Sequence, residues 1–129
     1  GLEAEALLPG KVIKVKGISI QGTNSPHGLN PIPVPENLGF VIQGKVFHPG
    51  DSLEKDILKK IEVILCPITA PWMRLTEGID FAKALKPKIA IPIHDGFMKY
   101  PFALNMFDKV MSEAGISVRA KSPGEFVDI

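Results

Sequence analysis

"LGFVIQGKVFHPGDS", residues 38–52, consists of two short apolar runs around a Gln-Gly pair, followed by His-Pro-Gly-Asp-Ser. The two runs predict a hairpin with strands at 38–42 and 45–48. The polar residues that follow lie where the second strand ends. Asp51 can be an ordinary turn residue there, because Pro, Gly, Asp and Ser are the residues that turns prefer. It can equally be a metal ligand, and the other ligands must then come from elsewhere in the chain.

Before this hairpin, the sequence predicts a second pair of strands and a loop. Residues 11–23, "KVIKVKGISIQGT", alternate apolar and polar side chains around a break at Gly17, which is typical of paired, half-buried strands. Residues 24–37 contain four prolines, all between positions 26 and 35. Proline fixes its own backbone angle and removes a hydrogen-bond donor, so this segment is predicted to be a loop.

After the hairpin, helical and strand patterns alternate. Apolar residues at 53, 57, 58 and 61 predict a short helix over "LEKDILKKI", with Ser52 as its cap. The continuous apolar run "EVILCPI", residues 62–68, predicts a strand that is buried on both faces.

Two more helices are predicted towards the C-terminus. One is centred on residues 76–85 with Thr76 as its candidate cap, and the other opens at Pro101 and ends at Gly115. The strands predicted in this part lie in "KIAIPIHDG" at 88–96, "ISVRA" at 116–120 and "EFVDI" at 125–129. Alternation of this kind is typical of an α/β fold.

Composition narrows the classes of function. A chain of 129 residues without an evident repeat or linker is expected to be one domain, and its net charge of +1 with no basic stripe argues against nucleic acid as a partner. No apolar run is long enough for a membrane helix, and the first residues do not resemble a signal peptide. The single cysteine, Cys66, excludes an internal disulfide and suits a reducing compartment, so we expect a cytoplasmic protein.

The chain has three histidines, and each lies in or beside a loop that follows a strand. His27 is in the proline-rich loop, His48 ends a predicted strand just before Asp51, and His94 follows "IAIPI". Strand ends are where α/β folds usually place reactive groups. Imidazole nitrogens with a carboxylate oxygen suit zinc, iron or manganese, although incidental residues at strand ends would give the same pattern.

Four stretches, taken together, resemble a known family. They are "GISIQGTNSPHG", "LGFVIQGKVFHPGDS", "VILCPI" and "LKPKIAIPIHDG". In this order and spacing they look like the C-terminal half of the metallo-β-lactamase superfamily. More narrowly, they resemble the branch of metal-dependent hydrolases that includes an ascorbate-phosphate lactonase. The resemblance implies half of an αββα sandwich, in which a mixed β-sheet carries helices on one face, over a single domain at 1–129.

The resemblance also implies a set of site residues. His27, Asp51 and His94 would be metal ligands, with Asp51 bridging two divalent ions and also fixing the nucleophile, and each histidine completing the shell of one ion. We expect zinc, with iron or manganese as alternatives. Trp72 would line a substrate pocket, or would simply pack beside the start of a helix. The resemblance gives His48 no ligand role, so packing next to the site is expected for it.

The chain departs from the family in one respect. The family takes its other ligands from a His-x-His-x-Asp-His motif in its N-terminal half, and no such motif occurs in this sequence. We therefore expect a fragment or shortened form of a hydrolase that acts on small-molecule esters, lactones or phosphodiesters, with little turnover by this chain alone. The alternative is a non-catalytic α/β half-domain that self-associates through an exposed apolar flank.

Overall fold

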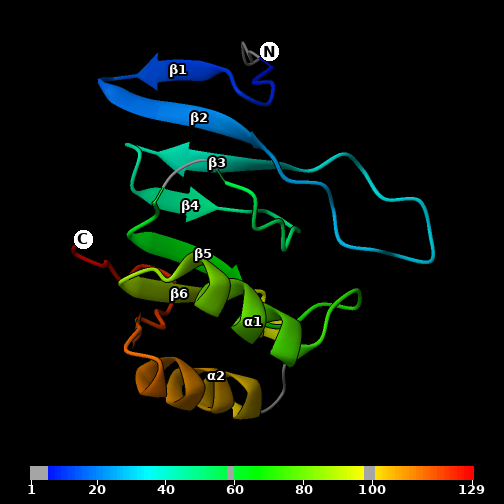
Figure 1. Cartoon of the computed structure of the whole chain (residues 1–129), viewed down its shortest axis with the longest axis vertical. Coiled ribbons are helices and arrows are strands. Elements are labelled where there is room, and N and C mark those ends of the chain that lie inside the picture. The colour runs from blue at the N-terminus through cyan, green and yellow to red at the C-terminus, as the bar shows by residue number, and fades with distance from the viewer. Residues whose placement is uncertain (1–5, 58–59, 98–100) are drawn as a thin grey trace.

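The computed structural model describes residues 6–57, 60–97 and 101–129, and these form a seven-stranded sheet with two α-helices (Figure 1). The elements are β1 (Val12–Val15), β2 (Ile18–Asn24), β3 (Leu38–Ile42), β4 (Val46–His48), β5 (Val63–Pro67), α1 (Leu75–Leu85), β6 (Ile89–Ile93), a 3-10 helix (Asp95–Phe97), α2 (Phe102–Glu113) and β7 (Ser117–Val118). The strands lie in the sheet in the same order as in the chain.

The first four strands pair antiparallel, and they include the two strand pairs that the sequence predicts. β1 and β2 are joined through Lys16 and Gly17, and β3 and β4 through Gln43 and Gly44. All four of these residues have positive φ, between 49° and 84°. Two consecutive residues of this kind form the tight turn whose twist matches that of the flanking strands. The predicted loop is confirmed from residue 25 to residue 37, while Asn24 is the last residue of β2.

The last four strands pair parallel, so the sheet is mixed. The connection from β5 to β6 contains α1, and the connection from β6 to β7 contains α2. Parallel neighbours need such crossover connections, and these explain the alternation of patterns in the second half of the sequence. The prediction of an α/β fold with a mixed sheet is therefore confirmed.

One face of the sheet is covered by both helices. Phe47 of β4 lies against Phe81 of α1, with ring centroids 6.4 Å apart and an angle of 61° between the rings. Phe107 and Met111 of α2 belong to the same buried cluster. The cluster consists of Val41, Phe47, Ile61, Ile64, Cys66, Ile68, Ile79, Phe81, Ala82, Ala90, Phe107, Met111 and Ile116. We call this side of the sheet the covered face.

The opposite side of the sheet also carries apolar residues. The strand registers align one aliphatic residue from each of six neighbouring strands on this side. This apolar row consists of Ile13, Ile20, Ile42, Val46, Val63 and Ile89. All but Val63 are only half-buried, and α1 and α2 lie on the other side. We call this side the open face.

The predicted helix over residues 53–61 is wrong for every residue of it that the structure describes; residues 58–59 lie outside the described residues. The Ser52 hydroxyl accepts a hydrogen bond from the Glu54 N–H at 3.1 Å, and the Glu54 carboxylate accepts one from the Asp56 N–H at 2.8 Å. These local bonds satisfy the backbone without a helix. The apolar residues still pack, because Ile61 is buried in the core.

Two smaller predictions are also wrong. Helix α1 is capped by Arg74, which precedes its first residue, while Thr76 lies within its first turn. Residues 125–129 form no strand. Instead, the Glu125 N–H bonds to the Ser122 carbonyl and the Glu125 carboxylate accepts from the Ser122 N–H, so this segment turns back on itself. Phe126 consequently remains 90% exposed.

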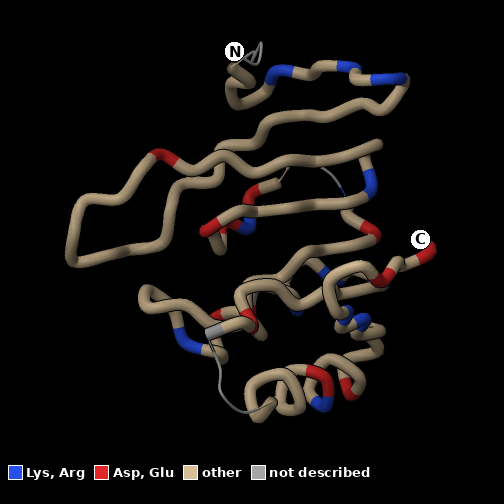
Figure 2. The backbone as a smooth tube through the Cα atoms, turned by 180° about the vertical axis from the view of Figure 1, so that it is seen from behind, with Lys and Arg blue, Asp and Glu red and all other residues tan. Residues whose placement is uncertain are grey.

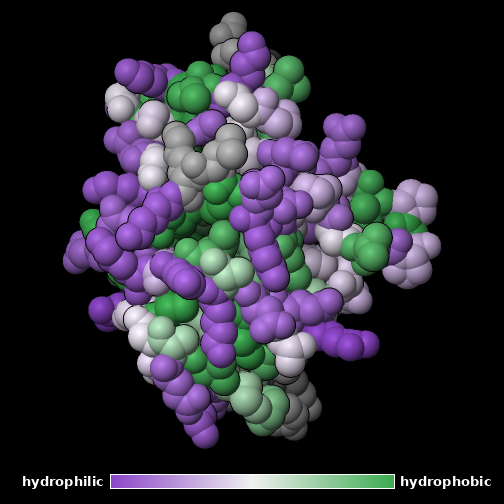
Figure 3. Space-filling view, viewed as in Figure 1, coloured by the Kyte–Doolittle hydropathy of each residue, from purple (hydrophilic) through white to green (hydrophobic). Residues whose placement is uncertain are grey.

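Charged residues of both signs are spread over the described chain, as the tube in Figure 2 illustrates. The hairpin of β1 and β2 is the exception, since residues 9–24 include Lys11, Lys14 and Lys16 and no acidic residue. On the side seen in Figure 3, hydrophilic side chains surround apolar patches. No helix within the described segments is long and apolar enough to cross a membrane.

Candidate metal centre

The three candidate metal ligands lie at one edge of the sheet. β2, β4, β5 and β6 run in the same direction, because β2 and β4 are both antiparallel to β3, and β5 and β6 are parallel to β4. Their carboxyl ends therefore meet at a single edge. His27 follows β2, Asp51 follows β4 and His94 follows β6, so loops from three strands converge there (Figure 1).

Asp51 is the centre of this convergence. Its Oδ1 lies 2.9 Å from the Nε2 of His94, and its Oδ2 lies 3.5 Å from the Nε2 of His27. The side chains are 38% exposed for Asp51, 28% for His94 and 11% for His27. The two imidazoles thus approach opposite oxygens of one carboxylate, which is itself partly exposed.

The hydrogen bond of His27 fixes how its ring faces Asp51. Nδ1 lies 2.7 Å from the carbonyl oxygen of Gly28. A carbonyl oxygen only accepts, so Nδ1 carries the proton, and in the neutral ring Nε2 presents its lone pair. A lone pair directed at a carboxylate oxygen is repulsive unless a proton or a cation lies between them. Histidine ligands in metal sites are commonly held in this way, with the second nitrogen bonded to a backbone carbonyl.

His94 is held by its backbone instead. Its φ of 61° lies in the left-handed region, which residues other than glycine adopt at a cost of about 1–2 kcal/mol. The Thr69 hydroxyl, from the end of the neighbouring strand β5, donates a hydrogen bond to the His94 carbonyl. Backbone strain of this kind persists only where the surroundings enforce it, and it is concentrated at functional sites.

The donor set fits a divalent metal, although it does not surround one position. No group of three or more His, Cys, Asp and Glu side chains in the described segments could by itself hold a metal ion. The His27–Asp51 separation of 3.5 Å is longer than a hydrogen bond and close to the roughly 3.4 Å expected between two ligands of a tetrahedral zinc ion. The His94–Asp51 separation of 2.9 Å is that of a hydrogen bond. Each histidine therefore forms a separate pair with Asp51.

His48 lies beside this site without contacting Asp51 directly. Its Nδ1 accepts a hydrogen bond from the Gly50 N–H at 3.0 Å. Burial lowers the pKa of His48, the neighbouring His94 lowers it further, and the Asp51 carboxylate partly opposes both. A ring that accepts at Nδ1 and resists protonation supports the loop that leads into Asp51, in line with the packing role expected from the sequence.

Trp72 packs against the site through its indole ring. The ring centroids of Trp72 and His27 lie 5.4 Å apart in an edge-to-face arrangement, with 61° between the planes. Gly28 lies directly beneath the indole, where any Cβ would overlap the ring. Trp72 therefore packs on the His27 loop and is half-buried. A role in substrate binding stays a prediction.

Sequence reasoning missed two residues that support the ligands. Thr69 bonds the backbone of His94, and Asn37 bonds the loops that carry the other two candidate ligands. Neither residue belongs to a periodic pattern or a recognisable motif. Only their positions could have suggested these two residues. Thr69 follows β5, whose carboxyl end lies at the same edge of the sheet, and Asn37 directly precedes β3.

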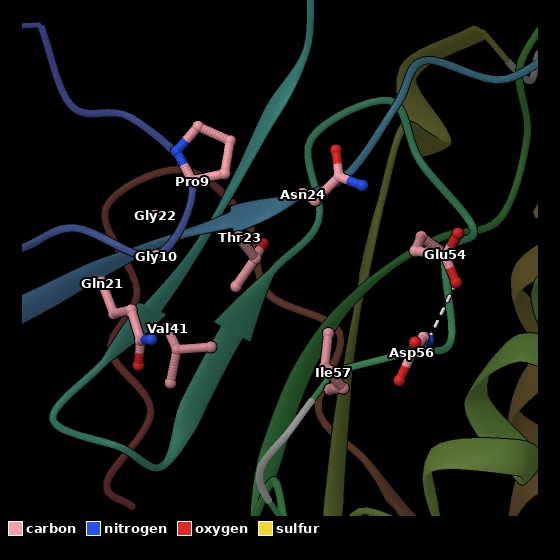
Figure 4. A pocket seen from close by; sticks show the side chains of 10 residues that line it. All are labelled: Pro9, Gly10, Gln21, Gly22, Thr23, Asn24, Val41, Glu54, Asp56 and Ile57. Atoms are coloured by element: carbon pink, nitrogen blue, oxygen red, sulfur yellow. Dashed lines mark hydrogen bonds between the residues drawn. The ribbon is translucent and has the colours of Figure 1, made fainter.

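A cavity of about 430 Å³ lies apart from these residues, between β2, β3 and the segment that precedes β5 (Figure 4). Its lining consists of Pro9, Gly10, Gln21, Gly22, Thr23, Asn24, Val41, Glu54, Asp56 and Ile57. None of the candidate ligands is among them. Figure 4 also draws the bond from the Asp56 N–H to Glu54, which shows that the Glu54 carboxylate supports its own loop.

The sequence is similar to a known family and to curated proteins. Residues 3–94 match the family described as "Beta-lactamase superfamily domain". The chain is 31% identical over 105 residues to the UPF0173 metal-dependent hydrolase Ta0764 of Thermoplasma acidophilum, a match that covers 73% of this chain and 47% of that protein. It is 27% identical to the UPF0173 metal-dependent hydrolase MJ1163 of Methanocaldococcus jannaschii, over 100% of this chain and 64% of that protein. Protein Rv0786c of Mycobacterium tuberculosis is 33% identical over 72 residues, which are 52% of this chain and 34% of that protein.

Solved structures agree with the sequence matches. Igni18, described as a novel metallo hydrolase from the archaeon Ignicoccus hospitalis, superposes with a TM-score of 0.70 and 26% identity, over 98% of this chain and 61% of that chain. A mutant of the CmlA beta-hydroxylase shares the fold, with a TM-score of 0.66 and 10% identity over 90% of this chain and 32% of that one. The chain spans from about a third to under two thirds of the proteins it resembles. With most of its length matched by the family, this chain belongs to the metallo-β-lactamase superfamily.

Proposed function

We propose that this chain supplies His27, Asp51 and His94 to the divalent-metal centre of a hydrolase that cleaves esters, lactones or phosphodiesters. The observation that carries the proposal is the Asp51 carboxylate with one imidazole nitrogen at each of its oxygens, 2.9 Å and 3.5 Å away. Two relatives that are named as metal-dependent hydrolases support it. We propose zinc as the metal, because imidazole and carboxylate ligands suit it and it needs no redox partner.

The three residues have different roles in this proposal. His27 and His94 would each hold one ion, and Asp51 would be the ligand that both ions share. When bound, the ions supply Lewis acidity, which makes a water molecule a better nucleophile and stabilises negative charge on the reacting group. Trp72 lines the substrate side of His27. Since the described residues hold no group of three ligands, the remaining ligands are proposed to come from the rest of the whole protein.

Metal content tests this proposal. The chain is loaded separately with zinc, manganese and ferrous iron, desalted and analysed by elemental mass spectrometry, beside Asp51→Asn. Asp56→Asn is the matched control, because Asp56 is an acid of the same connection between β4 and β5 and forms no ion pair with a histidine in the described structure. We expect metal in the wild type and in the control, and a loss of at least tenfold in Asp51→Asn. Equal metal in all three proteins would contradict the proposal, and no metal in the wild type would mean that the three residues hold an ion only together with the remaining ligands.

The open face supports a second candidate function, self-association. The apolar row runs across six strands, and five of its six residues are only half-buried. A contiguous apolar surface of this kind is typical of an interaction site. We propose that two copies of the chain associate through it. Light scattering at micromolar concentration should give a mass above that of a monomer, reduced to the monomer mass by Ile42→Lys. A monomeric wild type would contradict it.

A further inference from the structure

We propose that Asn37 is a positioning residue, whose single carboxamide sets the distance at which His27 and Asp51 face each other. The inference rests on the proposed function, since it concerns two of the proposed ligands. It goes further by assigning a role to a residue that contacts neither a metal ligand's side chain nor the open site.

Asn37 uses its whole carboxamide to join two loops. Nδ2 donates to the Ser25 carbonyl at 2.6 Å and to the Pro49 carbonyl at 2.9 Å, and Oδ1 accepts from the Asp51 N–H at 3.0 Å. Two partners can only accept and the third can only donate, so the orientation of the amide is fixed by its surroundings. Ser25 lies two residues before His27, and Pro49 lies two residues before Asp51.

A second hydrogen bond joins the same two loops after His27. The Gly28 N–H donates to the Asp51 carbonyl at 2.8 Å. The His27 loop and the Asp51 loop are therefore joined before His27, through Asn37, and after it, through Gly28. These bonds hold the backbone on both sides of His27. They therefore help to determine the 3.5 Å distance between His27 Nε2 and Asp51 Oδ2, which the two side chains alone do not set.

The surroundings of Asn37 leave little room for another arrangement. Gly50 has a φ of 63°, and any Cβ at this position would overlap the Asn37 amide. On the other loop, the Ser25 and Thr23 hydroxyls lie 2.8 Å apart, and Ser25 is 1% exposed. The residue whose carbonyl accepts from Asn37 is thus buried and hydrogen-bonded through its own side chain. Partners that orient metal ligands in this way typically change metal affinity by about 10–100-fold when they are mutated.

Two substitutions disturb the amide by different routes. Asn37→Asp keeps an oxygen that can accept from the Asp51 N–H but removes both donations. Gly50→Ala leaves Asn37 intact and pushes a methyl group against its amide. Asn105→Asp, on the exposed surface of α2, makes the same chemical change as Asn37→Asp far from the site and serves as the matched control.

The experiment has two readouts on the full 129-residue chain. The first is the Kd for zinc ions, from competition with a chromophoric chelator. The second uses the metal-free protein, in which long-range ¹H–¹⁵N correlation spectra report the tautomer of the His27 ring. We expect Asn37→Asp and Gly50→Ala to weaken zinc binding by about 10–100-fold. We also expect both to reduce the population with the proton on Nδ1 of His27, while Asn105→Asp changes neither.

The outcomes separate the two proposals. Zinc binding that is lost in Asp51→Asn but unchanged in both Asn37→Asp and Gly50→Ala would overturn the positioning role and leave the metal site standing. If the wild type binds no zinc, this chain needs the remaining ligands to hold the ion, and the tautomer then decides the positioning role. An Nδ1-protonated His27 that persists in both variants would overturn it, and a mixture of tautomers in both would support it.

Discussion

The two faces of the sheet are built from the same kinds of residue but are packed differently. On the covered face, Phe47 of β4 is fully buried against Phe81 of α1. On the open face, the adjacent residue Val46 belongs to the apolar row and is only half-buried. Strand, register and apolar character are shared, so the difference comes from the layer that lies on top. A strand pattern therefore predicts which residues can be buried, whereas a second layer decides which of them are.

Replacing one residue from each face should give the largest difference in the free energy of unfolding. Phe47→Ala leaves a cavity in a packed core and should lower the free energy of unfolding by about 3–5 kcal/mol. Val46→Ala removes two methyl groups from a half-exposed site and should cost about 1 kcal/mol. Unfolding in urea, followed by circular dichroism, measures both. Equal losses would mean that the open face is as tightly packed as the covered one.

The reactivity of the Cys66 thiol tests how tightly the covered face is packed. Burial raises the pKa of Cys66 from 9.0 to about 12. At pH 8 its thiolate fraction is then about 1000-fold below that of an unperturbed thiol, and alkylation by iodoacetamide should slow accordingly. Because the folded pKa is raised, this thiol adds stability that is complete below pH 9 and is lost as the pH rises towards 12. Rapid labelling of the folded chain at pH 8 would show that the covered face opens.

A smaller effect on the free energy of unfolding is expected for His94, at the edge of the sheet that carries the candidate metal centre. His94 has a φ of 61°, so a side chain there is strained and glycine is not. His94→Gly should therefore unfold with a free energy about 1 kcal/mol higher than His94→Ala, although both variants lose the imidazole. Thermal and urea unfolding of the metal-free proteins compare them. Identical stabilities would mean that the backbone relaxes when the ring is removed.

The smallest expected effect concerns His48, which projects from the open face of β4. Burial, and then His94, lower its pKa below 6.5. A histidine with a lowered folded pKa contributes stability above pH 6.5 that is lost as the pH falls through its folded value. His48→Gln should make the unfolding free energy of the metal-free chain less dependent on pH below 6.5. An unchanged pH profile would mean that other groups account for the acid sensitivity.

Local chemistry explains which parts of the fold could be predicted from the sequence. The alternating runs around Gly17 and the Gln43–Gly44 turn predicted the first four strands, because period and turn residues act over a few positions. The same reasoning failed for the described part of residues 53–61. There the apolar spacing suggested a helix, but a segment this short gains little helical stability on its own, and the Ser52 hydroxyl bonds the backbone in another way.

The candidate site was predictable only in part, for a related reason. His27, Asp51 and His94 each follow a strand, and strand ends that point the same way must meet at one edge. Asn37 gives no such signal, since its partners lie 12 and 14 residues away in the sequence and are reached only through the tertiary fold. Long-range hydrogen bonds to backbone carbonyls leave no pattern in a single sequence.

The sequential order of the strands has a consequence for how the chain folds. Each strand pairs with the one made just before it, so the sheet can grow during synthesis, at roughly 5–20 residues per second, without waiting for a distant segment. His27 and Asp51 can be held together as soon as β4 has paired. The pair between Asp51 and His94 must wait for β5, α1 and β6. During translation, one half of the candidate site is therefore assembled several seconds before the other.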